Sequence, residues 1–148
     1  MDLPDNLKIR AVLTQGGAFY GKLTDHGDEH PRFYFVLNLN PFSNSVILLT
    51  TSTTRFMSHR SCEGGDEIHI PLSNKDYEPF SKDCLICCAR PLKEVDRTDL
   101  EKKLKSQEYR LLEPVSKELL QKILTGVAKS KVIPPKQKKL ILPEENNF

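Results

Sequence analysis

The sequence predicts one small, mainly β domain that closes into a barrel and ends in an α-helix. Five or six short segments alternate or are rich in aromatic and β-branched residues, with turn signals between them, as in small barrels. Leucines then recur at helical spacing near the C-terminus. The 148 residues are the usual size of a single domain. We expect the barrel over about residues 17–95, helices over about 98–106 and 116–131, and a basic tail over 132–148.

The predicted strands begin with a segment that alternates between two turn-rich stretches, followed by two segments of stronger β character. The second of these begins apolar and ends in hydroxyl residues, and the NPFSN stretch before it is a predicted turn, so the two should form a hairpin. A short alternating segment and a buried, cysteine-containing segment come next and run into RPLKEV. The five predicted strands span Ala18–Leu23, Arg32–Leu39, Val46–Thr54, Glu67–Leu72 and Asp83–Ala89.

Two helices are predicted after the strands. Thr98 and Glu101 have the spacing of a capping box, so a short helix should begin there and turn Leu100 and Leu104 inward. A longer helix should begin with Ser116 as its N-cap. Its apolar stripe comprises Leu119, Leu120, Ile123, Leu124, Val127 and Ala128.

The two ends of the chain are less determined by pattern. Pro134 and Pro135 end the longer helix, and the segment after them is either a loose tail or an arm that docks through Leu140, Ile141 and Leu142. Residues 1–15 fit either a strand or a helix.

The cysteines predict buried, unpaired thiols in a reducing compartment. Three of the four lie in the apolar run CLICCA, and Cys62 stands apart. In a strand, Cys84 and Cys88 share one face about 13 Å apart, at roughly 3.3 Å per residue, while Cys87 points to the other face. Because these thiols cannot clamp one ion, we expect neither a metal site nor a cofactor. Disulfides are not expected.

Hydropathy and charge narrow the function classes. No apolar run approaches the roughly 20 residues that span a bilayer, and the first residues lack the apolar centre of a signal peptide, so a cytoplasmic protein without membrane contact is expected. The net charge is only +2, yet residues 117–139 hold seven lysines and one acid, which leaves 15 basic and 19 acidic residues elsewhere. This balance excludes tight, non-specific DNA binding by the whole surface and leaves a local groove open.

The order of segments resembles the MazF/PemK-like (Kid-like) toxins of bacterial type II toxin-antitoxin systems. The resemblance is carried by GAFYGKLTDHGDEHPRFYFVLN, SVILLTTSTT, DCLICCARPLKEVDRTDL and VSKELLQKILTGVAKSKVI, and it spans roughly Gly17 to Ile133. Its most specific part is a strand followed by an arginine and D-x-x-x-L leading into a helix, here between Cys84 and Leu100. The resemblance implies an SH3-like β-barrel, a homodimer, sequence-specific cleavage of single-stranded RNA, and inhibition by a cognate antitoxin peptide.

RNA cleavage of this kind needs no metal, because the 2′-hydroxyl of the substrate attacks the neighbouring phosphorus. The protein must move two protons and stabilise negative charge on the phosphoryl oxygens. An arginine fork suits that charge, and a hydroxyl can add a further donor. The resemblance places the arginine at Arg32 and the hydroxyl at Thr51, with Ser52 as the alternative if the register slips by one residue.

Further RNA contacts are expected from the loops that would flank the groove. His30 and His59 are the favoured histidines, whereas His69 alternates within a strand and is assigned a structural role. The RNA-binding candidates are therefore His30, Ser52, Arg55, His59 and Arg60.

Structural alternatives stand beside each of these roles. Arg32 can have a purely structural role, as the ion-pair partner of Asp25, Asp28 or Glu29. The hydroxyl residues from Thr50 to Thr54 can belong to an ordinary exposed strand. At the level of function, the same fold can be an inactive interaction module or a CcdB-like topoisomerase poison. In the toxin family a proline follows the arginine, whereas here Pro31 precedes Arg32. This difference favours the interaction module.

Overall fold

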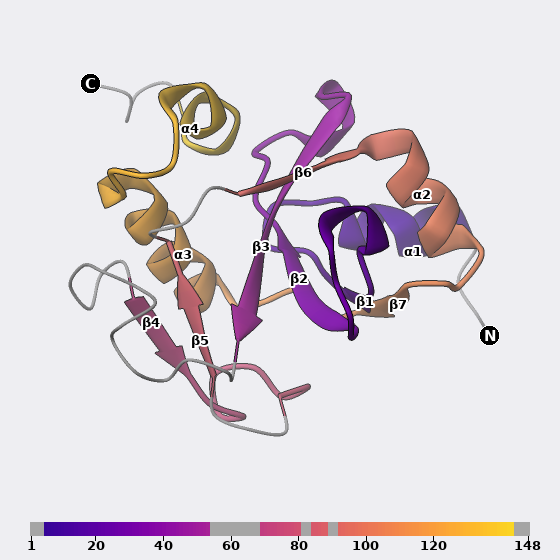
Figure 1. Cartoon of the computed structure of the whole chain (residues 1–148), viewed down its shortest axis with the longest axis horizontal. Coiled ribbons are helices and arrows are strands. Elements are labelled where there is room, and N and C mark those ends of the chain that lie inside the picture. Colours follow the sequence, from indigo (N-terminus) through magenta and orange to yellow (C-terminus); the bar gives the residue numbers. More distant parts are fainter. Residues whose placement is uncertain (1–4, 54–68, 81–83, 89–91, 144–148) are drawn as a thin grey trace.

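The computed structural model describes residues 5–53, 69–80, 84–88 and 92–143, and in these it contains seven strands and four α-helices (Figure 1). The strands are β1 (Ala18–Gly21), β2 (Arg32–Val36), β3 (Val46–Thr53), β4 (His69–Leu72), β5 (Cys84–Cys87), β6 (Lys93–Asp96) and β7 (Arg110–Leu112). The helices are α1 (Asp5–Val12), α2 (Arg97–Lys105), α3 (Lys117–Lys129) and α4 (Pro135–Ile141), with short 3₁₀ turns η1 (Thr24–His26) and η2 (Pro41–Ser43).

The strands form one antiparallel sheet in the order β4-β5-β3-β2-β1-β7, and β6 also pairs with β3. Strand β3 is the centre of this arrangement, since its first half pairs with β6 and its last residues pair with β5. The predicted β-rich fold is confirmed. The sheet is not closed into a barrel, because β4 and β7 stand at opposite ends of the order in the described part of the chain.

The predicted hairpin is confirmed as β2 and β3, joined through the 3₁₀ turn η2. Its register pairs Tyr34 with Thr51 and Val36 with Leu49. On the other side of β3, Leu49 pairs with Lys93 of β6. Directly paired residues project to the same face of a sheet, as do residues two apart in a strand, so this register places Arg32, Tyr34, Thr51 and Lys93 on one face.

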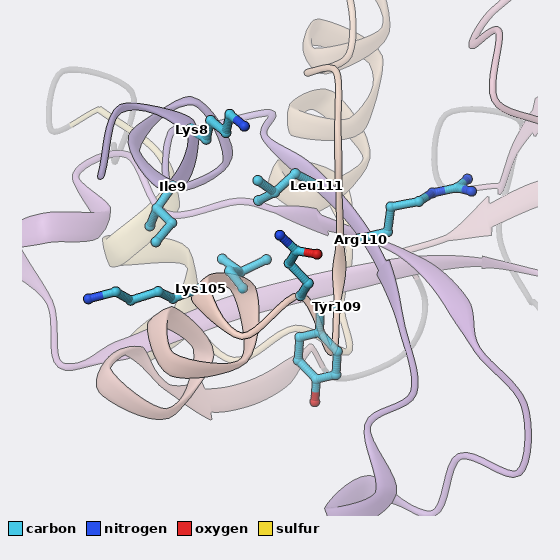
Figure 2. Close-up of a pocket in the computed structure, with 8 residues that line it drawn as sticks. Lys8, Ile9, Lys105, Tyr109, Arg110 and Leu111 are labelled. Carbon is cyan, nitrogen blue, oxygen red and sulfur yellow. The ribbon is translucent and has the colours of Figure 1, made fainter. Parts of the chain in front are cut away.

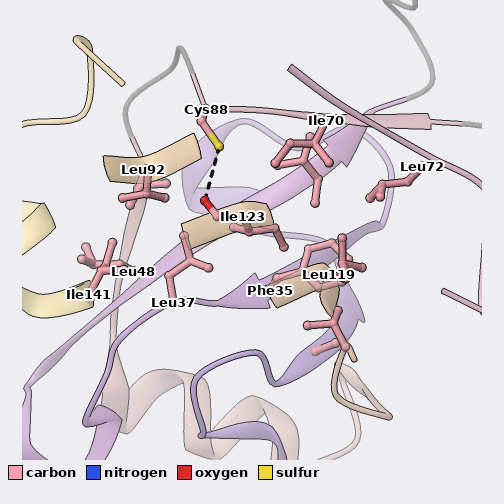
Figure 3. Close-up of a cluster of buried hydrophobic side chains, with 14 of the residues drawn as sticks. Phe35, Leu37, Leu48, Ile70, Leu72, Cys88, Leu92, Leu119, Ile123 and Ile141 are labelled. Atoms are coloured by element: carbon pink, nitrogen blue, oxygen red, sulfur yellow. Dashed lines mark hydrogen bonds between the residues drawn. The ribbon is translucent and has the colours of Figure 1, made fainter. Parts of the chain in front are cut away.

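Two hydrophobic cores lie on the two faces of the central strands. One core packs β4, β5, α3 and α4 against residues such as Phe35, Leu37 and Leu48 (Figure 3). The other packs α1 and α2 against Phe19, Tyr34, Val36, Ile47 and Leu49. The alternation of the sequence therefore supplies both faces of β2 with apolar side chains. Arg32, at the start of β2, is on the face of the strand that carries the second core.

For the two predicted helices, the buried faces match the prediction more closely than the residues at which the helices begin. The Ser116 cap is confirmed, because its hydroxyl accepts a hydrogen bond from the Leu119 N–H. The α2 cap was predicted wrongly: Asp96 accepts from the Asp99 N–H, so the helix begins at Arg97. A carboxylate two residues earlier competes with Thr98 as a cap. Leu100 and Leu104 are buried as predicted.

The termini settle two open alternatives. Residues 5–12 form a helix, and the C-terminal segment docks as α4, in which Ile141 is fully buried. Strand β7 was not predicted. It is only three residues long and pairs with β1 alone.

The cysteines confirm the predicted faces but not the predicted absence of disulfides. Cys84 and Cys88 lie in the first core as thiols outside any disulfide, and burial raises the pKa of Cys88 to about 12. Its sulfur lies 4.0 Å from the Ile123 carbonyl oxygen (Figure 3). Cys87 points to the other face, is half-buried and is disulfide-bonded, so the prediction of unpaired thiols was wrong there. None of the described helices has the length and apolar character needed to cross a bilayer.

Candidate functional site

A cleft of about 260 Å³ lies where the loop after η1 meets β2, β3 and β6. It brings together two cations, a histidine and two threonines from segments far apart in the sequence. The residues that line it are His26, Gly27, Asp28, Arg32, Leu49, Thr50, Thr51, Cys87, Leu92 and Lys93. The predicted pair Arg32 and Thr51 therefore lines one cleft.

Asp28 is the anchor of this cleft, and its side chain is only 3% exposed. Gly27 precedes it in the left-handed conformation, at φ 84°, which lets the chain turn out of η1 and direct the carboxylate inward. One carboxylate oxygen accepts hydrogen bonds from the Leu23 N–H, at 2.9 Å, and from the Tyr34 hydroxyl. The other oxygen faces Lys93 and Arg32. A buried carboxylate thus has partners on both oxygens.

Asp28 and Tyr34 have pKa values shifted in opposite directions. Burial alone would raise the pKa of Asp28, but hydrogen bonds from Tyr34 and the Leu23 N–H, together with the charge of Lys93, outweigh burial and hold that pKa below its usual value. Burial and the bond to Asp28 raise the pKa of Tyr34 far above that of a free phenol. Asp28 is therefore a carboxylate at neutral pH, and Tyr34 is a neutral donor.

The two cations meet Asp28 from different strands. Lys93 Nζ lies 3.3 Å from the carboxylate and 3.0 Å from the Tyr34 hydroxyl oxygen. Arg32 Nε lies 3.6 Å from the same carboxylate oxygen, and the arginine side chain remains 39% exposed. Among the described residues, the terminal nitrogens of the Arg32 guanidinium make no hydrogen bond to the chain. The planar guanidinium has the geometry to donate from these nitrogens to an anion that enters the cleft.

The hydroxyl of Thr51 already has a partner. Its Oγ1 donates to the Phe33 carbonyl oxygen at 2.6 Å and lies 3.3 Å from the Ser52 carbonyl oxygen. A hydroxyl carries one hydrogen and two lone pairs, so toward a ligand Thr51 can accept but not donate in this conformation. This geometry differs from the donor role expected from the sequence.

His26 is the histidine that lines the cleft. Its Nε2 lies 3.1 Å from the Glu94 carbonyl oxygen. Because a carbonyl oxygen only accepts, we assign the hydrogen to Nε2, which leaves Nδ1 of the neutral ring with a lone pair. His26 therefore keeps one ring nitrogen that can accept a hydrogen bond, and its side chain lines the cleft.

Several predicted RNA-binding residues lie elsewhere. His30 is exposed and does not line the cleft. Ser52 is buried on the opposite face of β3, where it pairs with Ile86, so the alternative register with Ser52 beside Arg32 is not the one adopted. Arg55, His59 and Arg60 lie outside the described residues. Their contacts with RNA remain predictions.

Sequence reasoning weighed Asp28 only as an ion-pair partner and did not single out Tyr34 or Lys93. Alternation within β2 places Tyr34 beside Arg32, so this neighbour was recoverable from the strand prediction. No local pattern relates Lys93 to Asp28, which is 65 residues away.

A second hollow, of about 390 Å³, lies between α1, the end of α2 and β7 (Figure 2). Three cations line it: Lys8, Lys105 and Arg110. In Figure 2 the side chains of Lys105 and Arg110 extend in opposite directions, and Arg110 lies over the Tyr20 ring. A phosphate needs donors that converge on one point. The Asp28 cleft is therefore the better candidate site for an anion.

No family model matches the sequence, and the search of curated proteins also found no match.

Proposed function

We propose that this chain is a metal-independent, sequence-specific endoribonuclease that cleaves single-stranded RNA, of the MazF/PemK-like toxin type. The observation that supports this proposal most is the convergence of Arg32 and Lys93 on one cleft, which His26 and Thr51 also line. Two cations suit the charge that builds up on a phosphoryl group under attack. The proposal also includes an SH3-like barrel as the finer fold class. The strands of the described residues form an open sheet.

In the proposed reaction, Arg32 donates hydrogen bonds from its terminal nitrogens to the phosphoryl oxygens, and Lys93 adds its charge. Thr51 accepts a hydrogen bond from a ribose hydroxyl. The 2′-oxygen bonds to phosphorus and loses its proton to Nδ1 of His26. The bond from phosphorus to the 5′-oxygen breaks, and that oxygen takes a proton from solvent at the open side of the cleft. The products are a 2′,3′-cyclic phosphate and a 5′-hydroxyl.

Charge around the cleft favours one path for the RNA backbone. Beyond His26 lies a small hollow lined by four acids, Asp25, Glu94, Asp96 and Asp99. These carboxylates repel phosphates, so we expect the strand to leave the cleft on the side of Arg32.

The experiment is incubation of the purified protein with a long RNA in EDTA, followed by mapping of the fragment ends. We expect cleavage at a short sequence with 5′-hydroxyl ends. His26→Ala should lower the rate by about 100-fold or more, since general acid-base catalysis commonly contributes that much. His30→Ala is the matched control, because His30 lies in the same loop but outside the cleft. Cleavage that requires a divalent cation would contradict the proposal.

A second candidate is an RNA-binding module without activity. It is favoured by the engagement of both predicted catalytic groups with their own chain, Arg32 with Asp28 and Thr51 with Phe33. Intact RNA that nevertheless binds in an Arg32-dependent manner would support this candidate. Homodimerisation and inhibition by an antitoxin peptide belong to the main proposal. Light scattering that shows only a 16.9 kDa species at micromolar concentration would remove the dimer.

A further inference from the structure

The C-terminal helix α4 is attached to the body of the protein at several points. The Gln15 side-chain amide donates to the Ile141 carbonyl oxygen at 2.8 Å, and the Leu39 N–H donates to the Leu140 carbonyl oxygen at 2.8 Å. Ile141 is fully buried in the first core. The far end of α4 is therefore held without any contribution from the start of the helix.

Gln137, near the start of α4, is a buried polar residue with 7% exposure, and its amide faces β6. Its Nε2 donates to the Glu94 carboxylate at 2.8 Å and to the Leu92 carbonyl oxygen at 3.4 Å. Its Oε1 accepts from the Leu92 N–H at 3.4 Å. Among the described strands β6 pairs only with β3, and the Gln137 amide lies at its start and bonds the backbone of Leu92 as a neighbouring strand would.

Strand β6 and the residue before it supply three features of the cleft. Leu92 lines the wall, Lys93 supplies a cation, and the Glu94 carbonyl oxygen accepts from His26 Nε2. We propose that Gln137 is a positioning residue, whose amide holds the start of β6 so that Lys93 and His26 face the cleft. Its catalytic consequence rests on the proposed ribonuclease function, whereas its effect on β6 does not.

The matched pair of variants is Gln137→Leu and Gln15→Leu. Each variant removes a side-chain amide at α4: that of Gln15 bonds the Leu37 and Ile141 carbonyls, whereas that of Gln137 bonds Glu94 of β6. Gln137→Leu should lower kcat for RNA cleavage roughly tenfold with a smaller change in KM, because small displacements of reacting groups are costly. Gln15→Leu should lower the melting temperature and leave kcat unchanged at temperatures where the variant is folded.

Two measurements do not require activity. In NMR hydrogen exchange, the Leu92 amide should lose protection in Gln137→Leu and keep it in Gln15→Leu. The ring-proton chemical shifts of His26 at pH 7 should change only in Gln137→Leu, because the Glu94 carbonyl that accepts from its ring lies in β6. If these NMR changes occur and neither protein cleaves RNA, the positioning role stands and the ribonuclease proposal fails.

A reversal of the hydrogen bond provides the rescue test. Gln137→Glu places a second carboxylate against Glu94 and should reduce kcat at least as far as Gln137→Leu. Adding Glu94→Gln supplies an amide donor from the other side and should recover most of the loss, while Glu94→Gln alone has a small effect. If Gln137→Leu and Gln15→Leu behave alike in every readout, or if the double variant recovers nothing, Gln137 is only an anchor for α4 and the inference is overturned.

Discussion

The Asp28 cleft and the hollow beside β7 both present cations, but only the cleft organises them. In the cleft, Lys93 and Arg32 lie 3.3 and 3.6 Å from one buried carboxylate oxygen. In the hollow, no described acid forms an ion pair with Lys8, Lys105 or Arg110. Long side chains without an ion-pair partner retain more rotamer freedom, which a ligand must remove on binding. A buried anchor, more than the number of charges, therefore prepares a site for an anion.

The largest effect is expected from disrupting the organised site at Arg32. Arg32→Ala should reduce RNA cleavage by about 100-fold to 1000-fold, because it removes a charge-assisted donor that acts most strongly in the transition state. Arg32→Lys should recover little, since a point charge does not reproduce the planar fork. Single-turnover rates with a labelled RNA measure both.

The hollow supplies the control for Arg32. Arg110→Ala removes an arginine from the same sheet without touching Asp28, and it should leave the cleavage rate within a factor of about two. Full activity of Arg32→Ala, together with a melting temperature several degrees lower, would make Arg32 a structural ion-pair partner.

A smaller effect on rate, with a larger one on stability, is expected at the anchor. Asp28→Asn should lower the cleavage rate roughly tenfold and the free energy of unfolding by about 1–3 kcal/mol at pH 7, because Lys93 and Arg32 lose their common partner. Lys93 and Arg32 are 27% and 39% exposed, which limits this loss through solvent screening.

The pH dependence of stability tests the anchor in a second way. The pKa of Asp28 is lowered in the folded protein, so its stabilising contribution is present above the unfolded value of about 3.9 and is lost as the pH falls through the folded value. Urea denaturation at pH 7, 5 and 3 should therefore show a shallower acid destabilisation in Asp28→Asn than in the wild type. Asp25→Asn, an exposed neighbour, should follow the wild-type curve.

The smallest effect is expected at Thr51. Thr51→Val keeps the β-branched shape but removes the bond to the Phe33 carbonyl, which should cost about 0.5–1.5 kcal/mol of stability. The cleavage rate should fall by less than in Arg32→Ala, because the hydroxyl is neutral. Thr51→Ser retains the hydroxyl and should stay near the wild type. A loss in Thr51→Val as large as that in Arg32→Ala would show that the hydroxyl does more in the reaction than accept a hydrogen bond from the ribose.

The parts that were predictable had strong local signals. Strand alternation and the NPFSN turn located the β2–β3 hairpin, and leucine spacing located α3. The signals for α1 and β7 were weak, since β7 has three residues and only one neighbouring strand. At α2, Asp96 and Thr98 both have the chemistry of a cap, and the end of β6 decides in favour of Asp96.

The histidines illustrate the same limit at the site. His26 and His30 lie in one loop with similar sequence surroundings, and the sequence favoured His30. The turn η1 and the left-handed Gly27 bring His26 within 3.1 Å of the Glu94 carbonyl and leave His30 exposed. A loop conformation of this kind depends on what the loop packs against, which is β6 in this protein.

Local sequence was enough to decide which side chains of each strand share a face, because the period of two is a local property of an extended backbone. It therefore placed Arg32 on the same side of β2 as Tyr34, and Thr51 on the partner strand. The meeting of Asp28, His26 and Lys93 at that face was decided by tertiary packing alone. Their approach depends on β6 pairing with β3 and on α4 closing over β6, and these contacts join segments more than 40 residues apart. Closing such long loops costs conformational entropy, and only the burial of the whole core offsets that cost. No local sequence pattern therefore predicts these contacts.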